Sequence, residues 1–280
     1  MTQTVGSAGV VAKGVRRWLQ RVVWMAILLP ALYGCAGTGP APVGNSVEPL
    51  TASDEPEARK RARIRMELAT GYFEQGQATI ALDELKQVLV IDPNFPDAYN
   101  LRGLIYMRLA DFRLADESFR KALTINPRDP NTLHNYGWML CQQARFAEAN
   151  AAFTQALASP VYGGQAKSWM TMGLCQMRAG QRPEAERSLA HSYEIDAGNP
   201  ITGYNLALLL FQRGDFPRAQ FYIRRLNNTE LANAETLWLG VKVERRMDNK
   251  AAMDQLSEQL KKRFGSSREA AALDRGAFDE

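Results

Sequence analysis

The sequence repeats itself about every 34 residues, and this period constrains the fold more than any other property of the chain. A small residue recurs in six successive segments at steps of 34, 34, 36, 34 and 33 residues (Ala69, Gly103, Gly137, Gly173, Ala207 and Gly240). An alanine follows 12 residues later in each segment (Ala81, Ala115, Ala149, Ala185, Ala219 and Ala252). A generic helical bundle would not keep this register over six periods, so the pattern indicates a stack of repeated units.

Small residues at positions 8 and 20 of a 34-residue unit, with alanine at position 27, resemble the tetratricopeptide repeat (TPR). Positions 8 and 20 are expected where two helices cross closely, and a proline at position 32 ends the second helix. Because one helix pair cannot bury its apolar face alone, the pairs stack. The expected fold is an all-α TPR superhelix over residues 57–267, with a C-terminal cap or tail at 268–280. Its six repeats are 62–95, 96–129, 130–163, 166–199, 200–233 and 234–267.

The 36-residue step has a local cause at residues 159–164, which read SPVYGG. One proline and two glycines stand where the other segments have a short turn, so a longer loop is expected between repeats three and four. A neutral insertion is the alternative.

The first 34 residues have the organisation of a secretory signal. Four basic residues precede the uncharged run VVWMAILLPAL at residues 22–32. Its eleven residues are too few to span a bilayer but fit the apolar region of a signal peptide. The next residues, Leu32-Tyr33-Gly34-Cys35, resemble the bacterial lipobox, which implies a signal peptide at 1–34 and diacylglycerol on Cys35. An uncleaved anchor, or an ordinary signal followed by an unimportant cysteine, are the alternatives.

The residues after Cys35 bear on where the protein resides. In lipoproteins an aspartate directly after the lipidated cysteine favours the inner membrane, and here that residue is Ala36. The resemblance therefore implies the periplasmic face of the outer membrane. Residues 35–56 lack periodicity and bulky apolar side chains, so they are expected to form a flexible tether reaching roughly 25 Å.

Charge and composition exclude several functions. Of the 34 basic residues, four lie before residue 35, so 30 remain against 30 acidic residues. A chain body of zero net charge lacks the basic footprint of a nucleic-acid-binding protein. Two histidines and three cysteines leave little material for a metal site, and no nucleophile stands at a recognisable spacing. We expect no enzyme activity, no small-molecule substrate and no cofactor besides the lipid on Cys35.

In TPR proteins, positions 2, 5, 9, 12 and 13 of the first helix line the concave face. Here these positions lack the Lys/Asn pattern that clamps a peptide carboxylate, and methionines, leucines and aromatics predominate. Such a groove suits amphipathic helices or extended apolar peptides. Packing between neighbouring helices is the alternative for each residue. The candidate groove residues are Met66, Phe73, Leu104, Met107, Trp138, Met170, Met177, Tyr204 and Phe211.

Cys141 and Cys175 fall on successive first helices at positions 12 and 10. Neighbouring helices pack roughly 8–10 Å apart, and Cα atoms more than about 7 Å apart cannot be bridged without backbone movement. We therefore expect two free, partly buried thiols, although a periplasmic location permits a disulfide.

Four segments go beyond what a TPR requires: LHNYGWMLCQQ at 133–143, FEQGQ at 73–77, ALDEL at 81–85 and SFRKAL at 118–123. Together they closely resemble the PilW/PilF family of outer-membrane lipoproteins for type IV pilus biogenesis, over residues 35 to about 265. The resemblance implies a pilotin, which binds the pilus secretin and promotes its localisation and assembly. A periplasmic scaffold for another envelope machine, or an adaptor that holds a hydrolase, are the alternatives.

Overall fold

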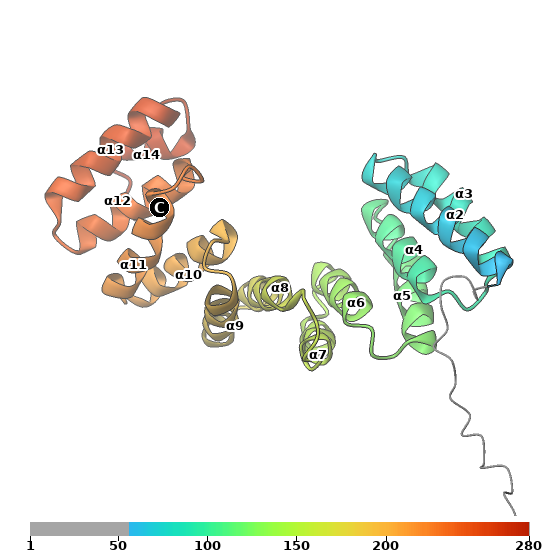
Figure 1. The fold of residues 1–280 in the computed structure, drawn as a ribbon. Helices are drawn as coiled ribbons and strands as arrows, with labels where there is room; N and C mark the ends of the chain where they lie inside the picture. Colours follow the sequence, from blue (N-terminus) through green and yellow to red (C-terminus); the bar gives the residue numbers. More distant parts are fainter. Residues whose placement is uncertain (1–55, 280) are drawn as a thin grey trace, which may run out of the picture. The chain divides into compact units, whose positions relative to one another are not determined.

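The computed structural model describes residues 56–279, which belong to one compact unit (Figure 1). The expected signal peptide, Cys35 and nearly all of the tether lie outside the described residues. Within 56–279 every regular element is a helix, which confirms the all-α class. The helices are α2 (Glu57–Glu74), α3 (Ala78–Ile91), α4 (Pro96–Arg108), α5 (Phe112–Ile125), α6 (Pro130–Gln142), α7 (Phe146–Leu157), α8 (Gln165–Arg178), α9 (Arg182–Ile195), α10 (Pro200–Arg213), α11 (Phe216–Asn227), α12 (Ala234–Arg246), α13 (Lys250–Phe264) and α14 (Arg268–Arg275).

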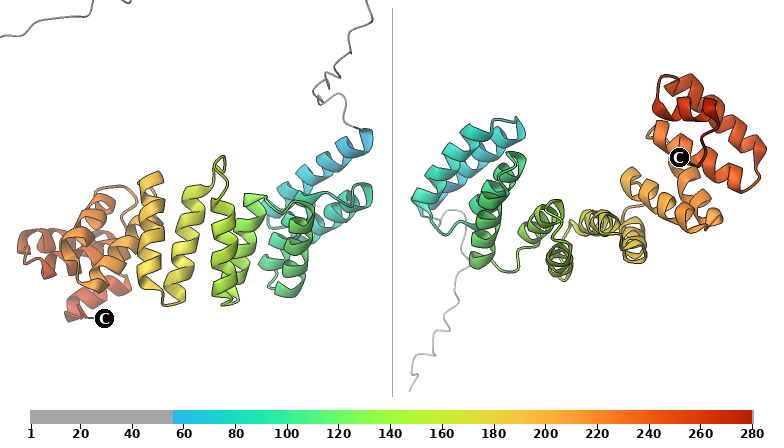
Figure 2. Two further views of the ribbon diagram at one scale, coloured as in Figure 1. Left: turned by 90° about the horizontal axis from the view of Figure 1, so that it is seen from below. Right: turned by 180° about the vertical axis from the view of Figure 1, so that it is seen from behind.

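Six helix pairs follow one another in chain order, and each pair consists of a first helix, A, and a second helix, B (Figure 2). Each A helix packs against its own B helix and, from α4 onward, against the B helix before it. The backbones of consecutive A helices also come close to one another, whereas within residues 56–279 the backbones of consecutive B helices do not. The A helices therefore lie closer together, as expected for the helices that line the inner face of a TPR stack.

The turn between the two helices has the same geometry in all six pairs. One residue in each turn has a positive φ, between 55° and 86° (Gly76, Ala110, Ala144, Gly180, Gly214 and Asp248). The next amide donates to the carbonyl five residues earlier, as from Asp111 to Tyr106 at 2.9 Å. This is the bond of a Schellman motif, which satisfies carbonyls at the end of a helix.

These turns correct the register of the sixth repeat. Asp248 lies 34 residues after Gly214, not 33 as the alignment of Gly240 with Ala207 predicts. Val241 is therefore the true equivalent of Ala207. Glu244, whose carbonyl accepts the sixth of these turn bonds, is the equivalent of the buried Leu210.

The longer loop after α7 contributes to packing. Tyr162 is buried against Leu133 and Ala156, and its hydroxyl lies 3.0 Å from Ser168 Oγ on α8. Ser168 Oγ in turn lies 2.8 Å from Nδ1 of His134 on α6. The loop therefore packs between repeats three and four and adds to the contact between them.

The expectation of free thiols is also wrong, because Cys141 of α6 and Cys175 of α8 form a disulfide. Their Cα atoms are 5.8 Å apart, and both side chains are fully buried. Spacing between helix axes overstates the gap between facing residues, since each Cα lies about 2.3 Å from its axis. Two A helices at ordinary spacing thus bring facing Cα atoms within reach of a disulfide.

The last helix closes the stack. α14 begins 34 residues after α12 and packs against α12 and α13, as the next A helix would. After Gly276 the chain folds back, and the ring of Phe278 lies 5.3 Å from the ring of Trp238. The guanidinium of Arg245 lies 3.9 Å from the centre of the Phe278 ring. No helix within residues 56–279 is long and apolar enough to cross a membrane.

Candidate partner-binding face

We call the side of the stack formed by positions 2, 5, 9, 12 and 13 of the A helices the A-helix face. All nine candidate groove residues lie on it, and each is partly buried. Met66 and Phe73 pack against the core of the first repeats, Leu104, Met107 and Trp138 against the next core cluster, and Met170, Met177, Tyr204 and Phe211 against the third. Each of these side chains therefore packs against the core with one part of its surface and exposes the other part to solvent.

At the N-terminal end of the face, the ring of Phe73 already has an intramolecular partner. The guanidinium of Arg108 lies 3.9 Å from the ring centre, and its Nη1 donates to the Phe73 carbonyl at 2.7 Å. Arg108 therefore links α4 to the end of α2 through a cation–π contact and a hydrogen bond. Sequence spacing did not indicate this contact.

In the middle of the face, His134 does not present a free imidazole. Its side chain is 6% exposed and lies against the ring of Phe153 as well as Ser168. Burial, with a smaller contribution from the charge of Lys167, lowers the pKa of His134 to about 4. The imidazole is therefore neutral near pH 7 and holds α6 to α8.

At the C-terminal end, α10, α12 and α14 enclose a small cavity of about 110 Å³. Tyr204 and Leu208 of α10 face Trp238 of α12 across it. Lys242 Nζ lies 5.5 Å from the Trp238 ring and 5.8 Å from the Phe211 ring, and burial lowers the pKa of this lysine.

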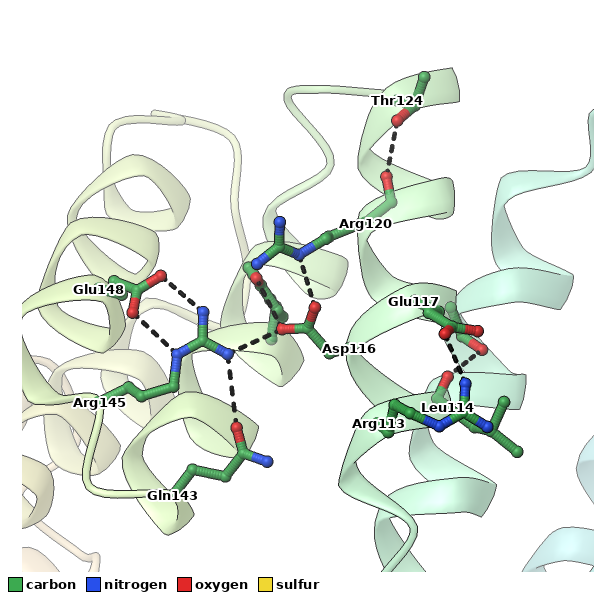
Figure 3. Close-up of polar contacts among 11 residues, drawn as sticks. Arg113, Leu114, Asp116, Glu117, Arg120, Thr124, Gln143, Arg145 and Glu148 are labelled. Atoms are coloured by element: carbon green, nitrogen blue, oxygen red, sulfur yellow. Dashed lines mark hydrogen bonds and ion pairs between the residues drawn. The ribbon is translucent and has the colours of Figure 1, made fainter.

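Ionic contacts outside this face join neighbouring repeats. Arg145, in the α6–α7 turn, lies between Glu148 and Asp116 (Figure 3). Its nitrogens donate to both Glu148 oxygens at 2.8 and 2.6 Å and to Asp116 at 2.9 Å, and these bonds raise the pKa of Arg145. Asp116 of α5 also accepts from Arg120 at 2.6 Å and from the Tyr136 hydroxyl at 3.1 Å. Repeats two and three are thus linked by charge-assisted bonds.

An ion pair between a buried carboxylate and a half-exposed guanidinium joins repeats five and six. Glu244 is fully buried on α12, and Arg224 of α11 donates to both its oxygens at 2.6 and 2.9 Å. Gln220 donates a third bond at 2.9 Å. Sequence reasoning missed this pair because the sixth repeat was read one residue out of register. In the correct register, a charged residue at a core position would have marked it.

Residues 56–279 contain no group of three or more His, Cys, Asp or Glu side chains that could hold a metal ion. The A-helix face combines apolar side chains with several cations and a few anions, which suits recognition of another polypeptide.

Comparisons with known proteins agree with this architecture. Models described as "TPR repeat" and "Tetratricopeptide repeat" match residues 71–109 and 96–129. The type IV pilus assembly protein PilF of Pseudomonas aeruginosa is 25% identical over 249 residues, which cover 89% of this chain and 96% of PilF. A solved structure of PilF superimposes with a TM-score of 0.71 over 79% of this chain and all of that one, at 24% identity.

The crystal structure of PilW, described as a widely conserved type IV pilus biogenesis factor, is 30% identical. It covers 76% of this chain and 97% of its own, with a TM-score of 0.66. The chain belongs to the PilF/PilW family. These relatives are type IV pilus TPR proteins, which places the A-helix face in a family of pilus biogenesis factors.

Proposed function

We propose that the protein is a pilotin: an outer-membrane lipoprotein that binds the type IV pilus secretin and promotes its localisation and assembly. The observation that carries the proposal is the relationship to PilF over 89% of this chain and 96% of PilF. The nine half-buried apolar residues of the A-helix face supply a surface for the secretin.

The anchor is part of the same proposal. Cys35 would carry the lipid, and the residues up to 56 would tether the repeats to the periplasmic face of the outer membrane. Each buried methylene contributes about 0.8 kcal/mol, so several acyl chains on one cysteine hold a folded body at a bilayer. A tethered TPR stack could then hold secretin subunits at the membrane where they assemble.

We further propose that the protein catalyses no reaction. The A-helix face consists mainly of apolar side chains, and its one histidine, His134, is buried and neutral. The assembly role of the relatives points the same way.

A chromosomal deletion tests the proposal. Loss of twitching motility together with loss of heat-resistant secretin multimers is expected, with restoration by the wild-type gene. Cys35→Ser should leave secretin monomers undelivered, and Ala36→Asp should shift the protein to the inner-membrane fraction. Normal pili and secretin multimers in the deletion strain, with a defect in outer-membrane permeability or cell shape, would instead support a scaffold for another envelope machine.

A further inference from the structure

We propose that the middle of the A-helix face, formed by α6, α8 and α10, binds an apolar segment of the partner that carries two carboxylates. Lys167 and Arg178, at the two ends of α8, receive these carboxylates. That the partner is the secretin rests on the proposed function; the chemistry of the segment follows from this chain alone.

The first argument is the charge of this part of the face. Among positions 2, 5, 9, 12 and 13 of α6, α8 and α10, the charged residues are Lys167 and Arg178. Both are exposed, and neither makes an ion pair with any residue between 56 and 279. Since His134 is neutral at pH 7, the middle of the face carries two positive charges and no negative one.

The second argument is the placement of the two cations. Lys167 and Arg178 are 11 residues apart, which returns the helix to within about 20° of the same side. The separation along the axis is about 16 Å. Met170, Leu174 and Met177 lie on the same face between them, each partly buried. An extended segment rises about 3.3 Å per residue and turns every second side chain to the same face, so two carboxylates four residues apart lie about 13 Å apart on one side. The long, flexible side chains of Lys167 and Arg178 can cover the remaining distance, and an apolar side chain of the segment lies between the two carboxylates.

The third argument is a contact within the chain that uses the same chemistry. At the end of α12, the Phe278 ring lies against Trp238 and under the guanidinium of Arg245. The next residue, Asp279, forms an ion pair with Arg246 at 3.1 Å. In this contact, an aromatic residue followed by a carboxylate covers the surface of an A helix whose last residues are arginines. α8 offers a similar end, Met177 and Arg178, without an occupant from residues 56–279.

Charge complementarity separates this section from the N-terminal end of the face. There Glu74 and Asp97 contribute negative charge beside Arg63 and Arg108. These anions repel an acidic segment while the arginines attract it, so the charges on α2 and α4 do not favour binding of such a segment. At the same positions of α6, α8 and α10 the charges are positive alone, and the acids beside the α10 edge of this section, Glu235 and Glu269, lie next to Tyr204, away from Lys167 and Arg178 on α8.

The charge-reversed variant Lys167→Glu/Arg178→Glu tests the inference against the matched control Lys86→Glu/Arg187→Glu. The control makes the same change of charge on the B helices α3 and α9, in exposed ion pairs three residues apart. With lipidated, detergent-purified protein and purified secretin subunits, we expect the first variant to bind about tenfold more weakly than wild type. The control should bind like wild type but melt slightly lower, because it places glutamates three residues from Asp83 and Glu184. Lys167→Glu/Arg178→Glu, which breaks no ion pair within residues 56–279, should keep the wild-type melting temperature.

A second measurement does not depend on the secretin. A five-residue peptide, Glu-Leu-Phe-Leu-Glu, should bind the wild-type chain at least fivefold more tightly than its analogue with glutamine at both ends. The preference should disappear in Lys167→Glu/Arg178→Glu and weaken with added salt. Equal binding of the two peptides to wild type would overturn the inference whatever the secretin does. Absence of secretin binding by wild type, with the peptide preference intact, would overturn only the pilotin proposal. Binding of anionic vesicles through Lys167 and Arg178, with no peptide preference, would show a lipid surface instead and likewise overturn the inference.

Discussion

The ring of Phe119 on α5 occupies the space that a Cβ on Gly103 of α4 would need. Three ring carbons lie 2.7 to 2.8 Å from that position. The same relationship joins Gly137 to Phe153, at 3.1 Å, and Gly173 to Leu189, at 2.7 Å. In repeats two, three and four, the glycine at position 8 of the A helix thus receives a large side chain from position 24 of its own B helix.

Gly103→Ala is therefore expected to destabilise the protein despite the better helix propensity of alanine. The Phe119 ring is fully buried and cannot move without displacing the core, and overpacking of this kind costs about 1–3 kcal/mol. Urea denaturation followed by circular dichroism measures the change. Gly71→Ala is the matched control: a Cβ there meets nothing within 4 Å, so the exchange should stabilise by about 0.5–1 kcal/mol. Equal effects at both positions would contradict the packing argument.

The positive φ in the six turns predicts that alanine-to-glycine exchanges there stabilise the protein, whereas glycine-to-alanine exchanges destabilise it. Ala110 and Ala144 have φ of 60° and 59°, a left-handed conformation that costs a residue with a Cβ about 1–2 kcal/mol. Ala110→Gly and Ala144→Gly should each raise the free energy of unfolding by a few tenths to about 1 kcal/mol, because glycine's greater entropy in the unfolded chain offsets part of the gain. Gly76→Ala, at φ 80°, should lower it by about 1 kcal/mol. Destabilisation by either alanine-to-glycine exchange would show that these turns are unstrained.

The sequence period predicted the helix pairs and the face because steric rules act at fixed positions in every repeat. Where two helices cross, the need for a small residue opposite a large one is met within one repeat, so it appears directly in the alignment. The same periodicity placed all nine candidate residues at partly buried sites. What it could not predict is what each meets there, as the contact of Arg108 with Phe73 shows.

Contacts between neighbouring repeats were missed for a physical reason. The Cys141–Cys175 disulfide, the Tyr162–Ser168–His134 chain and the Arg145–Asp116 pair each depend on how two repeats are rotated against one another. A repeat pattern carries no information on that rotation. Glu244 was missed differently: a one-residue error in register moved it from a core position to an adjacent one.

Because Glu244 is fully buried, removing its partner Arg224 alone is expected to destabilise the protein more than removing both residues. Arg224→Met leaves the carboxylate of Glu244 buried with only Gln220 as donor, which should cost about 3 kcal/mol. The double variant Arg224→Met/Glu244→Met removes the uncompensated charge and should recover most of that loss. Urea denaturation of the two variants and wild type decides the point. A double variant less stable than Arg224→Met would mean that packing at Glu244 matters more than its charge.

The disulfide predicts redox-dependent stability. It closes a loop with a sequence separation of 34 residues, and the chain-entropy model assigns such a loop about 4 kcal/mol. Reduction of the wild-type protein should lower its melting temperature, whereas Cys141→Ala/Cys175→Ala should melt at a lower temperature that reductant leaves unchanged. An oxidised wild type no more stable than the reduced form would argue against a stabilising role.

His134 predicts a loss of stability in mild acid. Its folded-state pKa is lowered to about 4 by burial, while an unfolded histidine takes up a proton near pH 6.5. Between these values the unfolded chain binds more protons than the folded one, so the free energy of unfolding falls as the pH is lowered from about 6.5 toward 4. The contribution of this residue at pH 5 is a loss of about 2 kcal/mol relative to pH 7.5.

His134→Gln isolates that contribution, because glutamine can still bond Ser168 but does not titrate. The variant should be less stable than wild type at pH 7.5, since the imidazole packing against Phe153 is lost. The difference in the free energy of unfolding between the two proteins should shrink by about 2 kcal/mol at pH 5. Only in wild type does a group that stays neutral when folded take up a proton on unfolding at that pH. His191→Gln, at an exposed site on α9, should keep the wild-type dependence because His134 is intact. Parallel stability curves for wild type and His134→Gln between pH 7.5 and 5 would show that the imidazole takes up its proton in the folded state without cost.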